Sequence, residues 1–125
     1  MRRHPLLAIL VALVLAGGCG STQRYPLLLP AEAATDLFTH LETEALARRF
    51  PVRRGNDWLE VSLPDGDTLQ YRVEGQDRNI FLTVSVNASG LSGEQTRLRH
   101  EKDKKLADEL VDAAKASGAR GRAFE

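Results

Sequence analysis

The sequence predicts an α+β fold in which two helices cover one face of a small antiparallel sheet. Three stretches between residues 58 and 87 alternate apolar and polar side chains, which is typical of strands with one buried face. The stretches 31–49 and 92–117 instead place apolar side chains at helical spacing. The expected order is therefore helix, three strands, helix, in two layers.

Residues 31–49 are expected to form the first helix. Pro30 suits the start of a helix, and Pro51 disfavours helical backbone at the residue before it. Apolar side chains between these limits fall on one helical face: Ala34, Leu37, Phe38, Leu41 and Ala45.

Residues 58–63, 68–74 and 80–87 are expected to form a three-stranded meander. The side chains on its buried face are Leu59, Val61, Leu63, Leu69, Tyr71, Val73, Ile80, Leu82, Val84 and Val86. Turns are expected at 64–67, where Pro-Asp-Gly-Asp has turn chemistry, and at 75–79. The apolar stretch 25–29 lies between polar residues and Pro30. It is either a fourth, edge strand or an apolar tether.

The last helix is expected to start at Ser92, since Ser92 and Gln95 have the spacing of a capping box. Its apolar stripe consists of Leu106, Leu110, Ala113 and Ala114. Gly118 fits the residue just past the helix end, so 118–125 is predicted to be a flexible tail. Eight of the twelve residues 94–105 are charged, and oppositely charged residues recur four positions apart. This half of the helix is expected to project from the body.

The N-terminal residues have the three parts of a secretory signal peptide. Arg2 and Arg3 give a positive start, residues 6–16 form an apolar run of eleven, and small residues follow. Eleven apolar residues are too few for a spanning helix, which needs about twenty. Residues 1–18 are therefore expected to be a signal that directs the chain out of the cytoplasm.

Residues 15–20, Leu-Ala-Gly-Gly-Cys-Gly, resemble the lipobox of bacterial lipoproteins, with Ala16 where Leu is usual. The resemblance implies that the signal is cut before Cys19, whose thiol receives a diacylglycerol and whose amino group is then acylated. Two or more acyl chains hold a protein stably on a bilayer. Gly20, where Asp commonly marks inner-membrane retention, favours the outer membrane. The alternative is an ordinary cleavable signal, with Cys19 either left as an unpaired thiol or removed with the signal.

The expected organisation is a signal peptide at 1–18, the lipidated Cys19 and a tether at 19–30, one domain at 31–117 and the tail at 118–125. This plan is similar to that of several small bacterial lipoproteins. The chain has 17 basic and 17 acidic residues, and this balance argues against a nucleic-acid partner. A single cysteine allows no internal disulfide.

No catalytic, cofactor-binding or metal-binding residues are predicted. After lipidation of Cys19, only His40 and His100 remain as nitrogen ligands, and both are expected to lie on the surface. The sequence contains neither a Gly-x-Ser-x-Gly motif nor a phosphate-binding glycine loop. Trp58 and Phe81 point to the open face of the sheet, where they would form a partner surface if their strands were adjacent. The alternative is that residues 25–29 cover this face.

The leading functional hypothesis is a monomeric lipoprotein of the cell envelope, anchored by lipid and facing the periplasm. It would bind another envelope protein or have a structural role, without enzymatic activity. The alternative is an inhibitor or immunity protein against a toxin or lytic enzyme. A deep pocket with a buried, pKa-shifted carboxylate would favour an enzyme instead.

Overall fold

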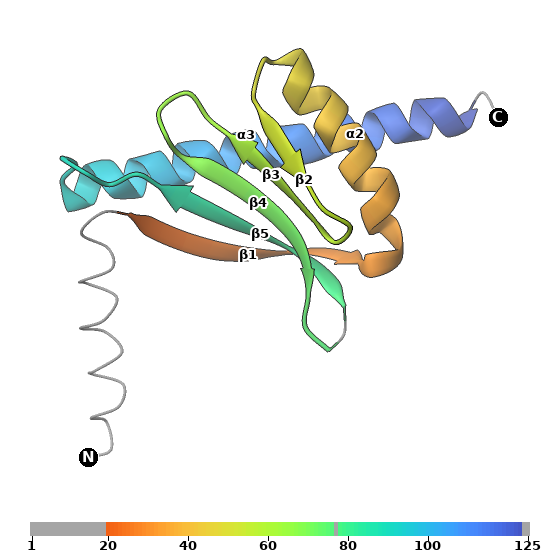
Figure 1. Ribbon diagram of the computed structural model, residues 1–125, viewed down its shortest axis with the longest axis horizontal. Helices are drawn as coiled ribbons and strands as arrows, with labels where there is room; N and C mark the ends of the chain where they lie inside the picture. The colour runs from red at the N-terminus through yellow and green to blue at the C-terminus, as the bar shows by residue number, and fades with distance from the viewer. Residues whose placement is uncertain (1–19, 77, 124–125) are drawn as a thin grey trace.

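The computed structural model describes residues 20–76 and 78–123, and it has the predicted α+β class (Figure 1). Five antiparallel strands form one sheet in the order β1-β5-β4-β3-β2. They are β1 (Ser21–Pro30), β2 (Val52–Arg54), β3 (Trp58–Ser62), β4 (Thr68–Glu74) and β5 (Asn79–Val86). The helices are α2 (Ala34–Ala47), which follows the 3-10 turn η1 (Ala31–Ala33), and α3 (Gly93–Ala123). Figure 1 shows α3 extending along the long axis of the molecule.

The central meander β3-β4-β5 has the predicted register. Tyr71 lies opposite Leu59 on one side and Leu82 on the other, and all three side chains are fully buried. All ten side chains that the alternation assigns to the core are buried. The Tyr71 hydroxyl donates a hydrogen bond of 3.1 Å to the Ala107 carbonyl, which connects the centre of the sheet to α3.

Both helices pack on this buried face. Leu37, Phe38 and Leu41 of α2 are buried, and they share the core with Leu110 and neighbouring residues of α3. The first helix ends close to the predicted position. The Phe50 N–H then donates to the Ala45 carbonyl, so the last turn is closed before Pro51.

The prediction of a three-stranded sheet is wrong because both edge strands are additional. The edge-strand alternative for residues 25–29 is confirmed, but β1 begins at Ser21, so the predicted tether lies largely within the sheet. Ser21 to Pro26 pair continuously with β5, and an irregularity follows before Pro30 pairs with Asn79. Residues 21–24 are all polar, so their strand conformation depends on backbone pairing and has no alternating hydrophobic signal.

The other edge strand, β2, was not predicted. It has only three residues, and Val52 is its half-buried member. Val52 pairs with Val61 of β3 and packs against the core. A strand this short gives no periodicity to detect in a sequence.

The prediction that α3 ends at Gly118 is also wrong, since the helix continues to Ala123. Gly118 is buried where α3 passes α2. A Cβ atom there would lie 3.5 Å from the Asp36 carboxylate and 3.6 Å from the His40 ring. These are ordinary contact distances, so Gly118 lies inside the helix at its contact with α2, and residues 118–123 are not a loose tail.

The charged half of α3 packs against the sheet and does not project freely. His100 and Asp103 are 2% and 1% exposed, respectively. The capping box is confirmed: the Gln95 N–H donates to Ser92 Oγ, and the Ser92 N–H donates to Gln95 Oε1. The predicted pair Arg97–Glu101 is present on the exposed side of the same turns.

Candidate functional site

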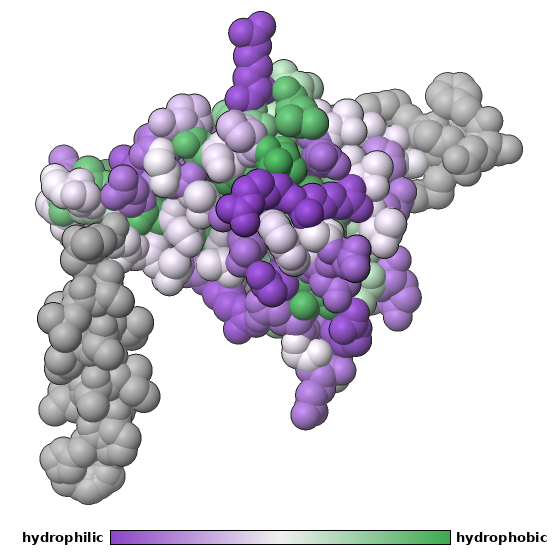
Figure 2. Space-filling model, in the orientation of Figure 1, coloured by the Kyte–Doolittle hydropathy of each residue, from purple (hydrophilic) through white to green (hydrophobic). Residues whose placement is uncertain are grey.

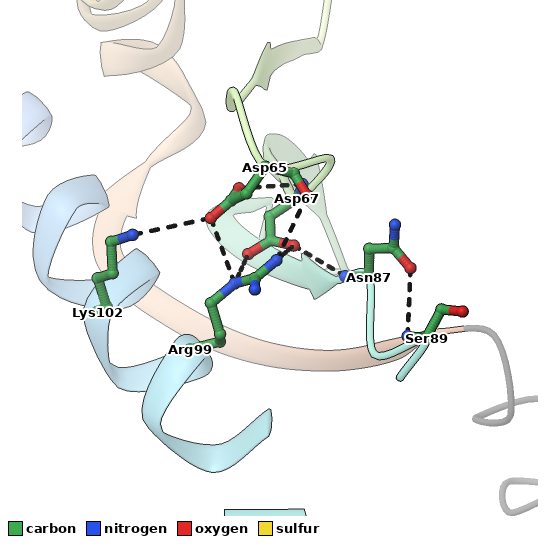
Figure 3. Close-up of polar contacts among 6 residues, drawn as sticks. All are labelled: Asp65, Asp67, Asn87, Ser89, Arg99 and Lys102. Carbon is green, nitrogen blue, oxygen red and sulfur yellow. Dashed lines mark hydrogen bonds and ion pairs between the residues drawn. The ribbon is translucent and has the colours of Figure 1, made fainter. Parts of the chain in front are cut away.

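The largest set of buried polar groups in the described residues lies where α3 meets the β3–β4 turn (Figure 3). Asp67, at the end of that turn, is completely buried. Arg99 of α3 binds both of its carboxylate oxygens, through Nε at 2.8 Å and Nη2 at 2.7 Å. The Asn87 N–H, just after β5, donates to the same carboxylate at 2.8 Å. Asp67 therefore joins three elements of the fold.

Asp103 lies one helical turn beyond Arg99, beside this carboxylate. Its Oδ2 is buried and has no hydrogen-bond partner in the part of the chain that the structure describes. Burial, together with the hydrogen bond and charge of Asp67, raises the pKa of Asp103 to about 8. Protonation turns a carboxyl oxygen into a donor, which suits the neighbouring carboxylate.

The pKa of Asp67 is shifted in the opposite direction, below its ordinary value. Burial alone would raise the pKa of Asp67, but hydrogen bonds from Arg99, Asp103 and the Asn87 N–H lower it to about 2. These opposite shifts indicate that the carboxyl pair shares one proton at neutral pH, and they assign it to Asp103 while Asp67 stays ionised beside Arg99.

Asp65 completes the cluster at its exposed edge. Its carboxylate lies 3.3 Å from Arg99 and 3.7 Å from Lys102. Oxygen atoms of Asp65, Asp67 and Asp103 lie within 4.8 Å of one another, a spacing at which carboxylates can hold a hard cation. Two positive side chains and one proton already balance the three carboxyl groups. We therefore assign this cluster a structural role.

An open groove of about 380 Å³ borders the cluster. Phe50, Leu63 and Leu106 form its apolar walls, and Asp103 and Lys102 contribute its polar part. It contains a buried carboxyl with a shifted pKa, which is the feature that would favour an enzyme. Besides Asp103, the groove contains two groups that could act in acid–base or nucleophilic chemistry, Asp65 and Lys102. These two are paired with each other, and Asp65 is also paired with Arg99.

The prediction that His100 lies on the surface is wrong. Its Nε2 lies 2.9 Å from Ser21 Oγ in a hydrogen bond, which connects α3 to the first residue of β1. Burial lowers the pKa of His100, although the charge of Asp67 opposes this effect, so the ring is neutral at pH 7. His40 is half-buried, and its Nδ1 lies 2.9 Å from the Asp36 carbonyl oxygen.

Trp58 and Phe81 lie on the open face of the sheet but do not meet. Arg72 of β4 lies between them, opposite Trp58 on one side and Phe81 on the other. Arg24 lies 4.3 Å above the Phe81 ring, and Figure 2 shows this face as mainly hydrophilic with small separate hydrophobic spots. β1 extends the sheet and does not cover this face, so neither predicted arrangement of the aromatic pair is present.

The Trp58 indole instead packs against the backbone before it. A Cβ atom at Gly55 would lie 2.2 Å from Trp58 Nε1, so a larger residue at position 55 would displace the ring. Arg53 of β2 lies 5.8 Å from the same ring. These contacts give Trp58 a role in fixing the β2–β3 connection.

Cys19 and the signal segment 1–18 lie outside the described residues. Within the described part of the chain, no helix combines the length and apolarity that crossing a bilayer requires. The sequence matches no protein-family model and no curated protein.

Proposed function

We propose that this protein is a lipoprotein of the cell envelope, anchored in a membrane through lipid on Cys19, with its domain facing the periplasm. The observation that carries the proposal is the junction Leu15-Ala-Gly-Gly-Cys19. It lies at the end of an apolar run of eleven residues, 6–16, which follows a positively charged start. Gly20 favours the outer membrane as the destination.

The domain is proposed to bind another envelope protein or to have a structural role, without catalysis. The supporting observation is the charge balance of the Asp67 cluster, whose carboxyl groups are already engaged by Arg99, Lys102 and a proton. Groups that stabilise one another in this way are not poised to act on a substrate.

Metabolic labelling with a fatty-acid analogue tests the anchor. We expect the wild-type chain to be labelled and to fractionate with membranes. Cys19→Ser should remain unlabelled and leave the membrane fraction, because serine has no thiol to receive the diacylglycerol. Ser21→Cys combined with Cys19→Ser is a matched control that restores a thiol two residues away, and it should also remain unlabelled. Label on either variant would contradict the proposal.

A further inference from the structure

The inference concerns how the domain is oriented on the membrane, and it rests on the proposed lipid anchor at Cys19. Only Gly20 separates Cys19 from the first residue of β1. Consecutive Cα atoms are about 3.8 Å apart, so the Cα atoms of Cys19 and Ser21 cannot be more than about 7.6 Å apart. The sequence places no flexible tether between the anchor and the sheet.

Ser21 is fixed to the body of the domain by two separate contacts. Its backbone pairs with Val86 at the end of β5. Its hydroxyl is hydrogen-bonded to the buried His100 ring of α3. An anchor attached two residues earlier therefore restrains the whole domain, since the strand cannot swing away without breaking the sheet and this hydrogen bond.

The strand register shows which other segments lie at the end of the sheet that contains Ser21. Ser85 of β5 pairs with Thr68, so the β3–β4 turn lies at the same end as Ser21, and Figure 1 shows the start of α3 there too. The β4–β5 turn lies at the other end of β5. Eight antiparallel residues separate these two ends, a length of about 24 Å.

The chemistry of the anchored end suits a lipid surface. The loop 87–93, Asn-Ala-Ser-Gly-Leu-Ser-Gly, has no charged residue in a chain of which 27% is charged. Leu98, in the second turn of α3, is 49% exposed. The opposite turn carries Glu74 and Arg78, and Arg78 is paired with Asp57.

We infer that loop 87–93 rests against the lipid bilayer to which Cys19 is attached. The β4–β5 turn then points away from the membrane. The partner of this surface is the bilayer itself, because the covalent chain leads into the membrane from this end and uncharged, small residues can approach lipid headgroups without a large desolvation cost.

The test uses the lipidated protein, whose Cys19 thiol is blocked, with one new cysteine for a fluorescent label. Ser89→Cys places the label in loop 87–93, and Gln76→Cys places it in the exposed β4–β5 turn as a matched control. Vesicles of phosphatidylethanolamine and phosphatidylglycerol contain a headgroup spin label as quencher. We expect several-fold stronger quenching at position 89 than at position 76.

A linker variant separates the orientation from the anchor. Twelve Gly/Ser residues inserted between Gly20 and Ser21 span about 20 Å, so this variant should remain lipidated and lose the difference between the two positions. Equal quenching at positions 89 and 76 without the linker would overturn the inference while leaving the proposed anchor intact. Failure of the wild-type protein to acquire lipid or float with vesicles would instead overturn both.

Discussion

The raised pKa of Asp103 has a consequence for the way in which the stability of the domain depends on pH. In the unfolded chain the same group ionises near its ordinary pKa of 3.8, whereas in the folded state its pKa is about 8. Between these two values the folded state holds a proton that the unfolded state has released. The contribution of Asp103 to stability is therefore complete below pH 3.8 and is lost as the pH rises towards 8.

Asp103→Asn should remove the pH dependence of stability that Asp103 causes. The amide has a similar shape and can donate a hydrogen bond to Asp67, but it does not titrate. Each pKa unit corresponds to about 1.4 kcal/mol. We expect the free energy of unfolding of the variant, relative to wild type, to rise by more than about 1 kcal/mol between pH 5 and pH 8. Urea unfolding of both proteins at several pH values measures this difference in the free energy of unfolding. Parallel profiles for the two proteins would show that Asp103 is not protonated in the fold.

Arg99 and Arg97 are two positions apart, but their contributions should differ greatly. Arg99 neutralises the fully buried Asp67, and removal of one partner from a buried ion pair costs about 3 kcal/mol or more. Arg97 pairs with Glu94 and Glu101 on the exposed side of α3, where solvent screens the charges and such pairs add little to stability.

We therefore expect Arg99→Ala to destabilise the domain strongly and Arg97→Ala to leave it almost unchanged. Urea unfolding of chains that start at Gly20 gives both values under the same conditions. Equal, small effects would mean that Asp67 finds another partner when Arg99 is removed.

At the scale of elements, α3 explains why part of the fold escaped prediction. Its packed face is a regular series: His100, Asp103, Ala107, Leu110 and Ala114. The spacing alternates between three and four, as on any buried helical face. A search for apolar residues finds only the second half of the series, because the first half consists of the polar residues His100 and Asp103. These two are accommodated in the core by contacts with Ser21 and Asp67, respectively. The spacing of three and four residues continues through the polar half, and it was the signal in the sequence that could have identified the whole packed face.

The strands of the sheet also divide into those that the sequence pattern predicts and those that it does not. The strands of the meander were predictable because each has one buried face, so apolar residues recur at every second position. The N-terminal half of β1 has polar residues on both faces, and β2 is three residues long. β1 is held by pairing to β5, which is distant in sequence, and local patterns do not reveal such a partner. β2 pairs with the neighbouring β3 but is too short to show a period. The Asp67 cluster was missed for a similar reason, since Pro64-Asp-Gly-Asp67 has the composition of an ordinary exposed turn.

The two edges differ in how they discourage further pairing of strands between molecules. β2 is short and ends in Arg53 and Arg54, both exposed. β1 contains Pro26 and is interrupted before Pro30, where Leu28 has a positive φ of 58°. Charged residues, prolines and irregularities on edge strands all oppose edge-to-edge association.

At the scale of the whole molecule, removal of β1 should therefore affect both the stability and the association state of the domain. A chain starting at Ala31 would lose the packing of Tyr25, Leu27 and Leu29 against the core and leave β5 as a bare edge. We expect it to be less stable in urea and to self-associate, whereas a chain starting at Gly20 should remain monomeric. Light scattering after size-exclusion chromatography measures the association. A stable monomer without β1 would contradict this role.

On the proposed lipidation of Cys19, the link between Ser21 and His100 also bears on the order of processing and folding. Enzymes that acylate this cysteine and cut before it would have to reach the backbone on both sides of it, which pairing of β1 with β5 would obstruct. Ser21 and His100 are 79 positions apart, and contacts between distant residues form slowly because a long loop must first close. Late docking of β1 would leave time for processing, so completion of the sheet would follow maturation of the N-terminus.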